Sequence, residues 1–194
     1  MLINLKLIEG PWELGYSLDK HTLNSTYIGI DAYGHDRWDT TRSEAGEALY
    51  QLKYKQDTTQ VDPIAQQLAI SIVNKFPKID FIVPMTPSTI RTVQPVLLVA
   101  ESLAQKIGVS YIENFLIKYG TNKQLKDLTS KEEKLEALNK VMSINDSAIN
   151  NGSWNVLIVD DLYDSGSSLE VACNLIKKNP KINKIFVASI TRKK

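Results

Sequence analysis

Two adjacent carboxylates, Asp160 and Asp161, precede a short run of small hydroxylated residues around one glycine, at positions 165–168. At the start of a helix, free backbone N–H groups and the positive end of the helix dipole favour a phosphate, and Gly166 lets the backbone approach it closely. The two acids would repel a phosphate in direct contact. They can instead accept hydrogen bonds from sugar hydroxyls about one ribose away, with Mg²⁺ as a screen. The spacing therefore predicts a ribose 5-phosphate site, with the phosphate at the glycine end and the ribose diol at the acidic end.

The strand before the acids indicates how they are positioned. Residues 156–159 form a continuous apolar run, which is typical of a parallel strand buried on both faces. In open α/β sheets, ligands bind outside the carboxyl ends of the strands, which is where Asp160 and Asp161 fall. Further apolar runs predict strands at 3–7, 80–83, 185–188 and, as one strand or two short ones, 110–117.

Helices are expected between these strands, at 43–54, 62–76, 89–107, 130–139 and 167–178. Asp62 is the expected N-cap of the second helix. Gly108 ends the third, whose regular part begins only at Pro95, and Ser130 with Glu133 makes a capping box for the fourth. This alternation of strands and helices predicts an α/β fold with a mostly parallel sheet flanked by helices.

The amino-terminal third of the chain has a less regular pattern. Between residues 15 and 39, short apolar patches are broken by Gly29, Gly34 and polar clusters, which indicates a small antiparallel unit. We therefore expect residues 1–60 to form an appendage able to hood the site, and residues 61–194 to form the core domain.

The composition excludes several classes of protein. Hydrophobic residues make up 43% of the 194 residues, and the formal net charge of +1 gives no field that would attract nucleic acid. No apolar run approaches the roughly 20 residues of a membrane span. The single cysteine, Cys173, excludes an internal disulfide and argues for a reducing compartment. These features predict a cytoplasmic protein with small-molecule partners, and they leave a homodimer open.

Residues 156–168 resemble the signature of the type I phosphoribosyltransferases: an apolar strand, two acids, two apolar residues and a small hydroxyl–glycine loop. The resemblance implies the Rossmann-like parallel sheet of that family. It also implies transfer of ribose 5-phosphate from phosphoribosyl pyrophosphate to a nitrogen nucleophile, with release of pyrophosphate. Mg²⁺ would be held through the donor, with no dedicated protein site.

The likeness extends to the competence-associated ComF-type members of that family, over about residues 43–191. Their strand, proline-bearing loop, arginine and helix are similar to residues 82–104, and their Lys-Tyr pair is similar to Lys53-Tyr54. The chain departs from this branch in two ways. One cysteine cannot supply the zinc-binding cluster that usually precedes the domain. The run Arg91-Thr92-Val93-Gln94-Pro95 also lacks the glycine of the family's pattern.

The family pattern assigns roles to residues of this chain. Asp160 and Asp161 would bind the ribose and associate with Mg²⁺. Asp164 would be the catalytic base, since an acid at this position assists proton removal from the acceptor in purine-salvage relatives. The other sets are the 5-phosphate-binding residues Asp164, Ser165, Gly166, Ser167 and Ser168, the pyrophosphate loop Thr86, Pro87, Ser88 and Arg91, and the flexible loop with Lys118, Thr121 and Gln124.

Other interpretations stay open. A buried strand ending in two acids also occurs in response regulators, but their further acidic cluster near the chain start is represented here only by Glu9. Asp164 could simply begin the turn before the helix, Arg91 could be a surface residue, and residues 118–128 could be an ordinary loop. A second function is a non-catalytic regulator that binds donor or nucleotide on the same fold, or a competence-related protein. The missing glycine after Arg91 favours that alternative.

Overall fold

The computed structural model of the protein describes residues 1–87, 89, 91–120 and 130–193. Its centre is a six-stranded sheet with the order β1-β2-β10-β9-β5-β6. β1 pairs antiparallel with β2, and the other neighbouring strands pair in parallel, which confirms the predicted mostly parallel sheet. The strands are β1 (Lys6–Leu7), β2 (Leu14–Lys20), β10 (Ile182–Arg192), β9 (Trp154–Tyr163), β5 (Phe81–Pro84) and β6 (Ser110–Tyr111).

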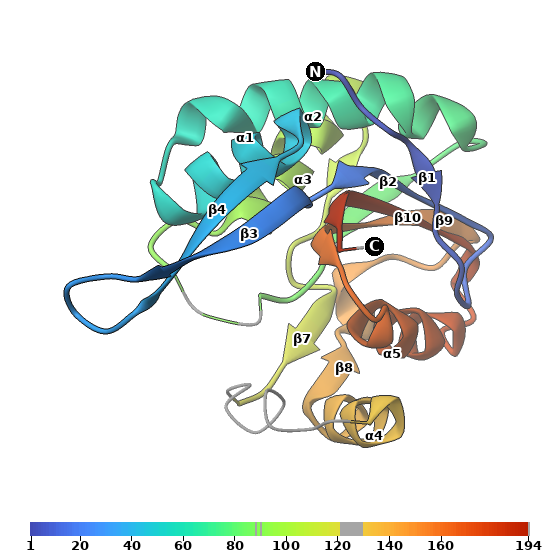
Figure 1. The fold of residues 1–194 in the computed structure, drawn as a ribbon. Coiled ribbons are helices and arrows are strands. Elements are labelled where there is room, and N and C mark those ends of the chain that lie inside the picture. Colours follow the sequence, from blue (N-terminus) through green and yellow to red (C-terminus); the bar gives the residue numbers. More distant parts are fainter. Residues whose placement is uncertain (88, 90, 121–129, 194) are drawn as a thin grey trace.

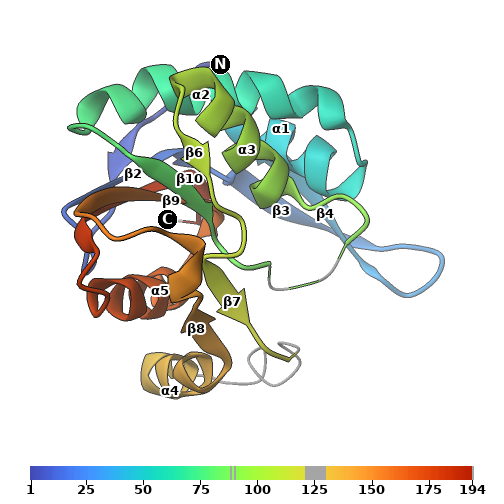
Figure 2. The ribbon, with the colours of Figure 1, turned by 180° about the vertical axis from the view of Figure 1, so that it is seen from behind.

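Helices cover both faces of the sheet (Figures 1 and 2). One face carries α1 (Glu44–Tyr54), α2 (Val61–Ser71) and α3 (Pro95–Ile107), and the other carries α5 (Ser167–Lys177). The alternating side chains of β9 divide between these layers. Leu157 and Val159 belong to the core cluster of α1, α2 and α3, whereas Val156 and Ile158 belong to that of α5. The apolar run 156–159 is therefore buried on both faces, as predicted.

Two smaller units extend from the main sheet. A separate hairpin projects to one side, and a second two-stranded sheet lies beside α5 with α4 below it in Figure 1. Among the described residues, no helix is both long and apolar enough to cross a bilayer. The remaining elements are β3 (Thr22–Ile30), β4 (Asp36–Arg42), β7 (Leu116–Lys118), α4 (Lys131–Val141), β8 (Met142–Ile144), η1 (Thr58–Gln60), η2 (Val73–Lys75) and η3 (Asp146–Ala148).

Most helix ends follow the local signals in the sequence. The regular part of α3 begins at Pro95 and ends at Gly108, which has the left-handed φ of 71° that glycine adopts without strain. The capping box of α4 is present. Ser130 Oγ accepts from the Glu133 N–H at 3.1 Å, and Glu133 Oε2 accepts from the Ser130 N–H at 3.3 Å.

The predicted start of α2 is wrong. Its N-cap is Gln60, not Asp62. The preceding 3₁₀ turn η1 is capped by Asp57, whose Oδ1 accepts from the Thr59 N–H at 3.1 Å. Because this turn leads directly into the helix, Asp62 lies in the first turn, where a carboxylate still complements the helix dipole.

The first 60 residues contribute to both the main sheet and the projecting hairpin. β2 pairs in parallel with β10 from Leu14 opposite Phe186 to Lys20 opposite Arg192, and α1 packs into the main core. The β3–β4 hairpin forms a sheet of its own. The division into an appendage and a core at residue 60 stays a prediction, with two strands of the amino-terminal part lying inside the central sheet.

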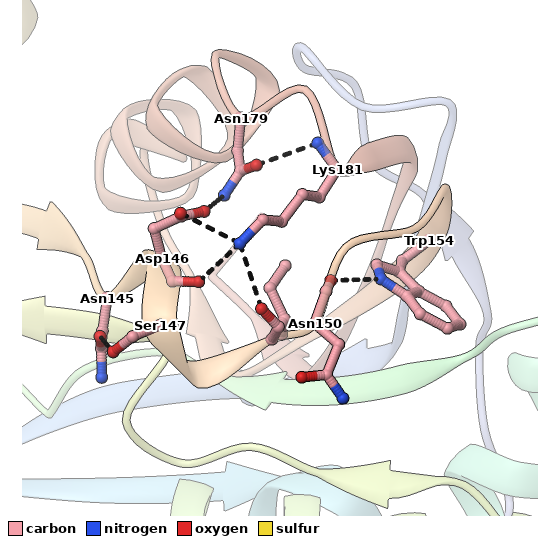
Figure 3. Close-up of polar contacts among 8 residues, drawn as sticks. Asn145, Asp146, Ser147, Asn150, Trp154, Asn179 and Lys181 are labelled. Atoms are coloured by element: carbon pink, nitrogen blue, oxygen red, sulfur yellow. Dashed lines mark hydrogen bonds and ion pairs between the residues drawn. The ribbon is translucent and has the colours of Figure 1, made fainter.

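The half-buried side chain of Lys181 ties the segment after β8 to the segment between α5 and β10 (Figure 3). Lys181 Nζ donates to the backbone oxygens of Asp146 at 3.0 Å and Ile149 at 3.1 Å, and to Asp146 Oδ2 at 3.0 Å. Asn179 Nδ2 donates to Asp146 Oδ1 at 2.7 Å. This cluster holds the β7–β8 unit against the helix that begins at the predicted phosphate loop.

Candidate functional site

A cavity of about 220 Å³ opens at the carboxyl ends of β5 and β9. The cavity is open here because β9 pairs with β5 over a shorter stretch than with β10. Its pairing with β5 ends where Val159 lies opposite Pro84, while its pairing with β10 continues to Tyr163 opposite Arg192. The lining residues are Lys53, Met85, Thr86, Pro87, Thr89, Arg91, Gln94, Pro95, Val96 and the continuous run 160–169.

The acid pair lies within β9, because pairing with β10 extends the strand beyond the predicted apolar run. Asp160 Oδ1 accepts from the Asp161 N–H at 2.9 Å. Burial, and then the neighbouring Asp161 carboxylate, raise the pKa of Asp160 well above its ordinary value. The Asp161 backbone oxygen accepts from Thr191 Oγ1 at 3.0 Å. Asp160 therefore holds its proton to higher pH than an exposed aspartate does.

The loop after the acids turns into α5 at Gly166. This glycine is the N-cap of the helix and has a φ of 77°. The first helical hydrogen bond runs from the Glu170 N–H to the Gly166 oxygen at 2.8 Å. The amides of residues 167–169 precede that bond, so they have no acceptor within the helix and can donate to an anion. Ser165 Oγ and Ser167 Oγ lie 3.0 Å apart and add hydroxyl donors beside them.

The segment after β5 forms the wall opposite the loop. Of the residues of the predicted pyrophosphate loop, Thr86, Pro87 and Arg91 line the cavity, and Ser88 lies outside the described residues. The Arg91 guanidinium carbon lies 5.8 Å from the centre of the Tyr54 ring, within the range of a cation–π contact. A cation and a hydroxyl group therefore face the same space as the acid pair.

Asp164 lines the cavity but has a partner that the sequence did not reveal. Its carboxylate accepts a hydrogen bond from Lys193 Nζ, just after β10, and both side chains are about half exposed. The pair forms because β9 and β10 run in register up to Tyr163 and Arg192, which brings the following residues together.

The predicted flexible loop is described only at its start. Lys118 ends β7 and does not line the cavity, and its pKa is lowered by burial. Thr121 and Gln124 lie outside the described part of the chain.

Lys53 is a functional candidate to which sequence analysis gave no role. Its Nζ donates to Asp161 Oδ2 at 2.6 Å, across 108 positions of the chain. The pair is mostly buried, with the Lys53 and Asp161 side chains 18% and 22% exposed. The one signal in the sequence was the Lys53-Tyr54 pair itself, since nothing local indicates that α1 ends beside β9.

The lining carries more acid than base. Lys53 and Arg91 are its cations, and Asp160, Asp161 and Asp164 are its acids, among the lining residues that the structure describes. No group of three or more histidine, cysteine, aspartate or glutamate side chains could hold a metal ion in the described regions. A magnesium ion here would thus need oxygens from a ligand besides the two aspartates, and Mg²⁺ commonly binds phosphates in this way.

No protein-family model matches the chain, and no curated protein matches it. Solved structures do. The glutamine phosphoribosylpyrophosphate amidotransferase of B. subtilis, complexed with ADP and GMP, superposes with a TM-score of 0.52 at 14% identity, over 83% of this chain and 35% of that one. The adenine phosphoribosyltransferase of Trypanosoma brucei, in complex with AMP, pyrophosphate and ribose-5-phosphate, gives a TM-score of 0.51 at 12% identity, over 97% of this chain and 74% of that one. The chain therefore has the α/β fold of the phosphoribosyltransferases.

Proposed function

We propose that the protein transfers ribose 5-phosphate from phosphoribosyl pyrophosphate to a nitrogen nucleophile. The observation that carries this proposal is the arrangement of the β9–α5 segment, in which two carboxylates and a helix amino terminus line one cavity on consecutive residues. The structural likeness to two phosphoribosyl-handling proteins supports it at the level of the fold.

Each part of the donor has a matching part of the lining. The 5-phosphate accepts hydrogen bonds from the amides and hydroxyls of residues 164–168, to which Asp164 contributes its main-chain N–H. The ribose hydroxyls donate to Asp160 and Asp161. The pyrophosphate lies toward Thr86 and Arg91, whose charge stabilises the leaving group as it gains negative charge.

The reaction is a substitution at the ribose C1. The lone pair of the acceptor nitrogen forms a bond to C1, and the bond from C1 to the pyrophosphate oxygen breaks, so that pyrophosphate leaves with the bonding electrons. Asp164 accepts the proton that the nitrogen loses. Bound Mg²⁺ supplies charge neutralisation of the pyrophosphate, with Asp160 and Asp161 as the protein groups able to contact it.

A second candidate function is a donor- or nucleotide-binding regulator, including a competence-related role. The ion pair between Asp164 and Lys193 favours it, because the Asp164 carboxylate is engaged by this ammonium and not by an acceptor. The run from Arg91 to Pro95 without a glycine points the same way.

Pyrophosphate release in the presence of Mg²⁺, donor and a panel of purines, pyrimidines and small amines tests the transferase proposal. The Asp164→Asn variant should keep donor affinity within a few-fold while turnover falls by roughly 10²–10⁴. Tight donor binding by the wild type with no pyrophosphate release from any acceptor would favour the regulator. Equal turnover of wild type and Asp164→Asn would leave the transferase intact and remove Asp164 as the base.

A further inference from the structure

The carboxyl end of α1 reaches both sides of the cavity. Lys53 binds Asp161 of the acid pair at 2.6 Å, and the next residue, Tyr54, places its ring 5.8 Å from the Arg91 guanidinium carbon on the opposite wall. A helix that served only to cover the sheet would not need to end between two charged walls of a cavity.

The turn that follows this helix end is strained. Gln56 has a φ of 58°, and among the described residues it is the one other than glycine with a positive φ. Two backbone amides hold the turn in place, because the Lys55 and Asp57 N–H groups both donate to the Gln51 oxygen, at 3.0 and 3.1 Å. Left-handed backbone at a non-glycine residue is unfavourable and persists where the surroundings fix it. The backbone at the end of α1, which carries Lys53, is thus held by the turn as well as by the ion pair.

The charges in the lining indicate a role for Lys53 beyond neutralising Asp161. Three acids face two cations in the described lining, yet the proposed donor carries an anionic 5-phosphate and an anionic pyrophosphate. The 5-phosphate has the amides at the start of α5 as donors. The pyrophosphate has Arg91 on one wall, and Lys53 is the second cation of the cavity, on an unbranched stem that can turn from a carboxylate to a phosphate.

We propose that Lys53 is a donor-binding residue that neutralises Asp161 in the empty site and moves to the pyrophosphate when phosphoribosyl pyrophosphate binds. This inference rests on the proposed function. On binding, the ribose hydroxyls take the place of the ammonium at Asp161. Lys53 and Arg91 then both contact the leaving pyrophosphate.

Calorimetric titration of four proteins with two ligands tests this role. The proteins are the wild type, Lys53→Met, Lys53→Arg and the control Lys55→Met, which removes an exposed lysine two residues away. The ligands are Mg²⁺ with phosphoribosyl pyrophosphate, and ribose 5-phosphate, which lacks the pyrophosphate. Lys53→Met should bind the pyrophosphate-bearing ligand roughly ten- to a hundredfold more weakly, the effect of one charge-assisted hydrogen bond. Its affinity for ribose 5-phosphate should stay within about threefold, Lys53→Arg should recover most of the loss, and Lys55→Met should match the wild type.

A double variant separates direct binding from an effect through Asp161. In the Asp161→Asn background, Lys53→Met leaves no carboxylate at position 161 without its cation, so this protein should fold even if Lys53→Met alone does not. The selective loss of affinity should persist in that background. Equal weakening of both ligands, or no further loss beyond that of Asp161→Asn, would overturn the role of Lys53. Normal binding of the donor by Lys53→Met would also overturn it and leave the transferase proposal standing. Failure of the wild type to bind millimolar donor would instead refute the proposed function itself.

Discussion

Replacing Gly166 by alanine tests the phosphate loop, because the structure offers a matched control at Gly108. Both glycines have left-handed backbone, with φ of 77° and 71°. A Cβ at Gly108 would meet no atom within 4 Å, whereas a Cβ at Gly166 would lie 3.0 Å from the Cε2 and Oη atoms of Tyr163. Gly108→Ala therefore measures the backbone cost alone, and Gly166→Ala measures that cost plus a contact.

The expected magnitudes follow from these two terms. Left-handed backbone costs alanine about 1 kcal/mol relative to glycine. The contact with Tyr163 adds about 1 kcal/mol, because the ring must move and its hydroxyl donates to the Glu9 oxygen at 3.3 Å. In a chain of this size, the melting temperature should fall by about 2–4 °C for Gly108→Ala and about 4–8 °C for Gly166→Ala.

Thermal unfolding and titration with ribose 5-phosphate provide the two measurements. Gly166→Ala should also weaken the ligand by roughly tenfold or more, since the amides before Glu170 shift with the loop. Tyr163→Leu in the Gly166→Ala background should restore the stability lost to the contact but not that lost to the backbone. Equal destabilisation by the two glycine variants would refute the contact, and unchanged affinity in Gly166→Ala would refute the loop as a phosphate site.

Two further substitutions test the acid pair and the hydrogen-bonded cluster around Lys181 shown in Figure 3. Because burial and Asp161 raise the folded-state pKa of Asp160, the folded protein holds its proton more tightly than the unfolded chain, and stability falls as pH rises above about 4 toward the folded pKa. Asp160→Asn should remove this loss and stabilise the ligand-free protein at pH 8 by about 1–3 kcal/mol in urea unfolding. The same variant should no longer bind the donor. Lower stability of the variant than of the wild type at pH 8 would contradict this reasoning. Lys181→Met should lower the melting temperature by about 2–6 °C, with the exposed Lys184→Met as its control. Lys181 and then Asn179 lower the pKa of Asp146. Part of the difference in melting temperature should therefore vanish as pH falls through that lowered pKa. A difference that increased at acidic pH would count against the stabilising role of this cluster.

Local sequence signals predicted the elements that depend on neighbouring residues. The capping box at Ser130, the end of α3 at Gly108 and the two-sided burial of 156–159 are confirmed, since each depends on a few consecutive side chains. The pairing of β2 with β10 was not predicted, because it joins residues near both ends of the chain. Asp62 was misplaced for a local reason: the 3₁₀ turn η1 leads directly into α2, so the helix begins before Asp62.

The predictions about the candidate site also depended on whether the residues are adjacent in the sequence. The acid pair, Gly166 and the serines around it are consecutive, so their chemistry could be predicted from one stretch of sequence. The partners of the acids could not, because Lys53 and Lys193 reach Asp161 and Asp164 from α1 and from the residue after β10. Their positions depend on how three segments end at one edge of the sheet, which only the folded chain determines.

The charge of the lining explains why the helix amino terminus alone does not account for donor binding. Amides and hydroxyls at residues 165–168 can hold one phosphate, but the adjacent Asp160 and Asp161 repel a second anionic group unless cations intervene. Arg91 lies in the segment that follows β5 and Lys53 lies in α1, and both line the cavity because α1 ends beside that segment. The fold thus supplies the first phosphate contact from a continuous motif and the cations for the second from remote elements. A change in α1 that leaves the motif intact should therefore alter how the protein handles pyrophosphate.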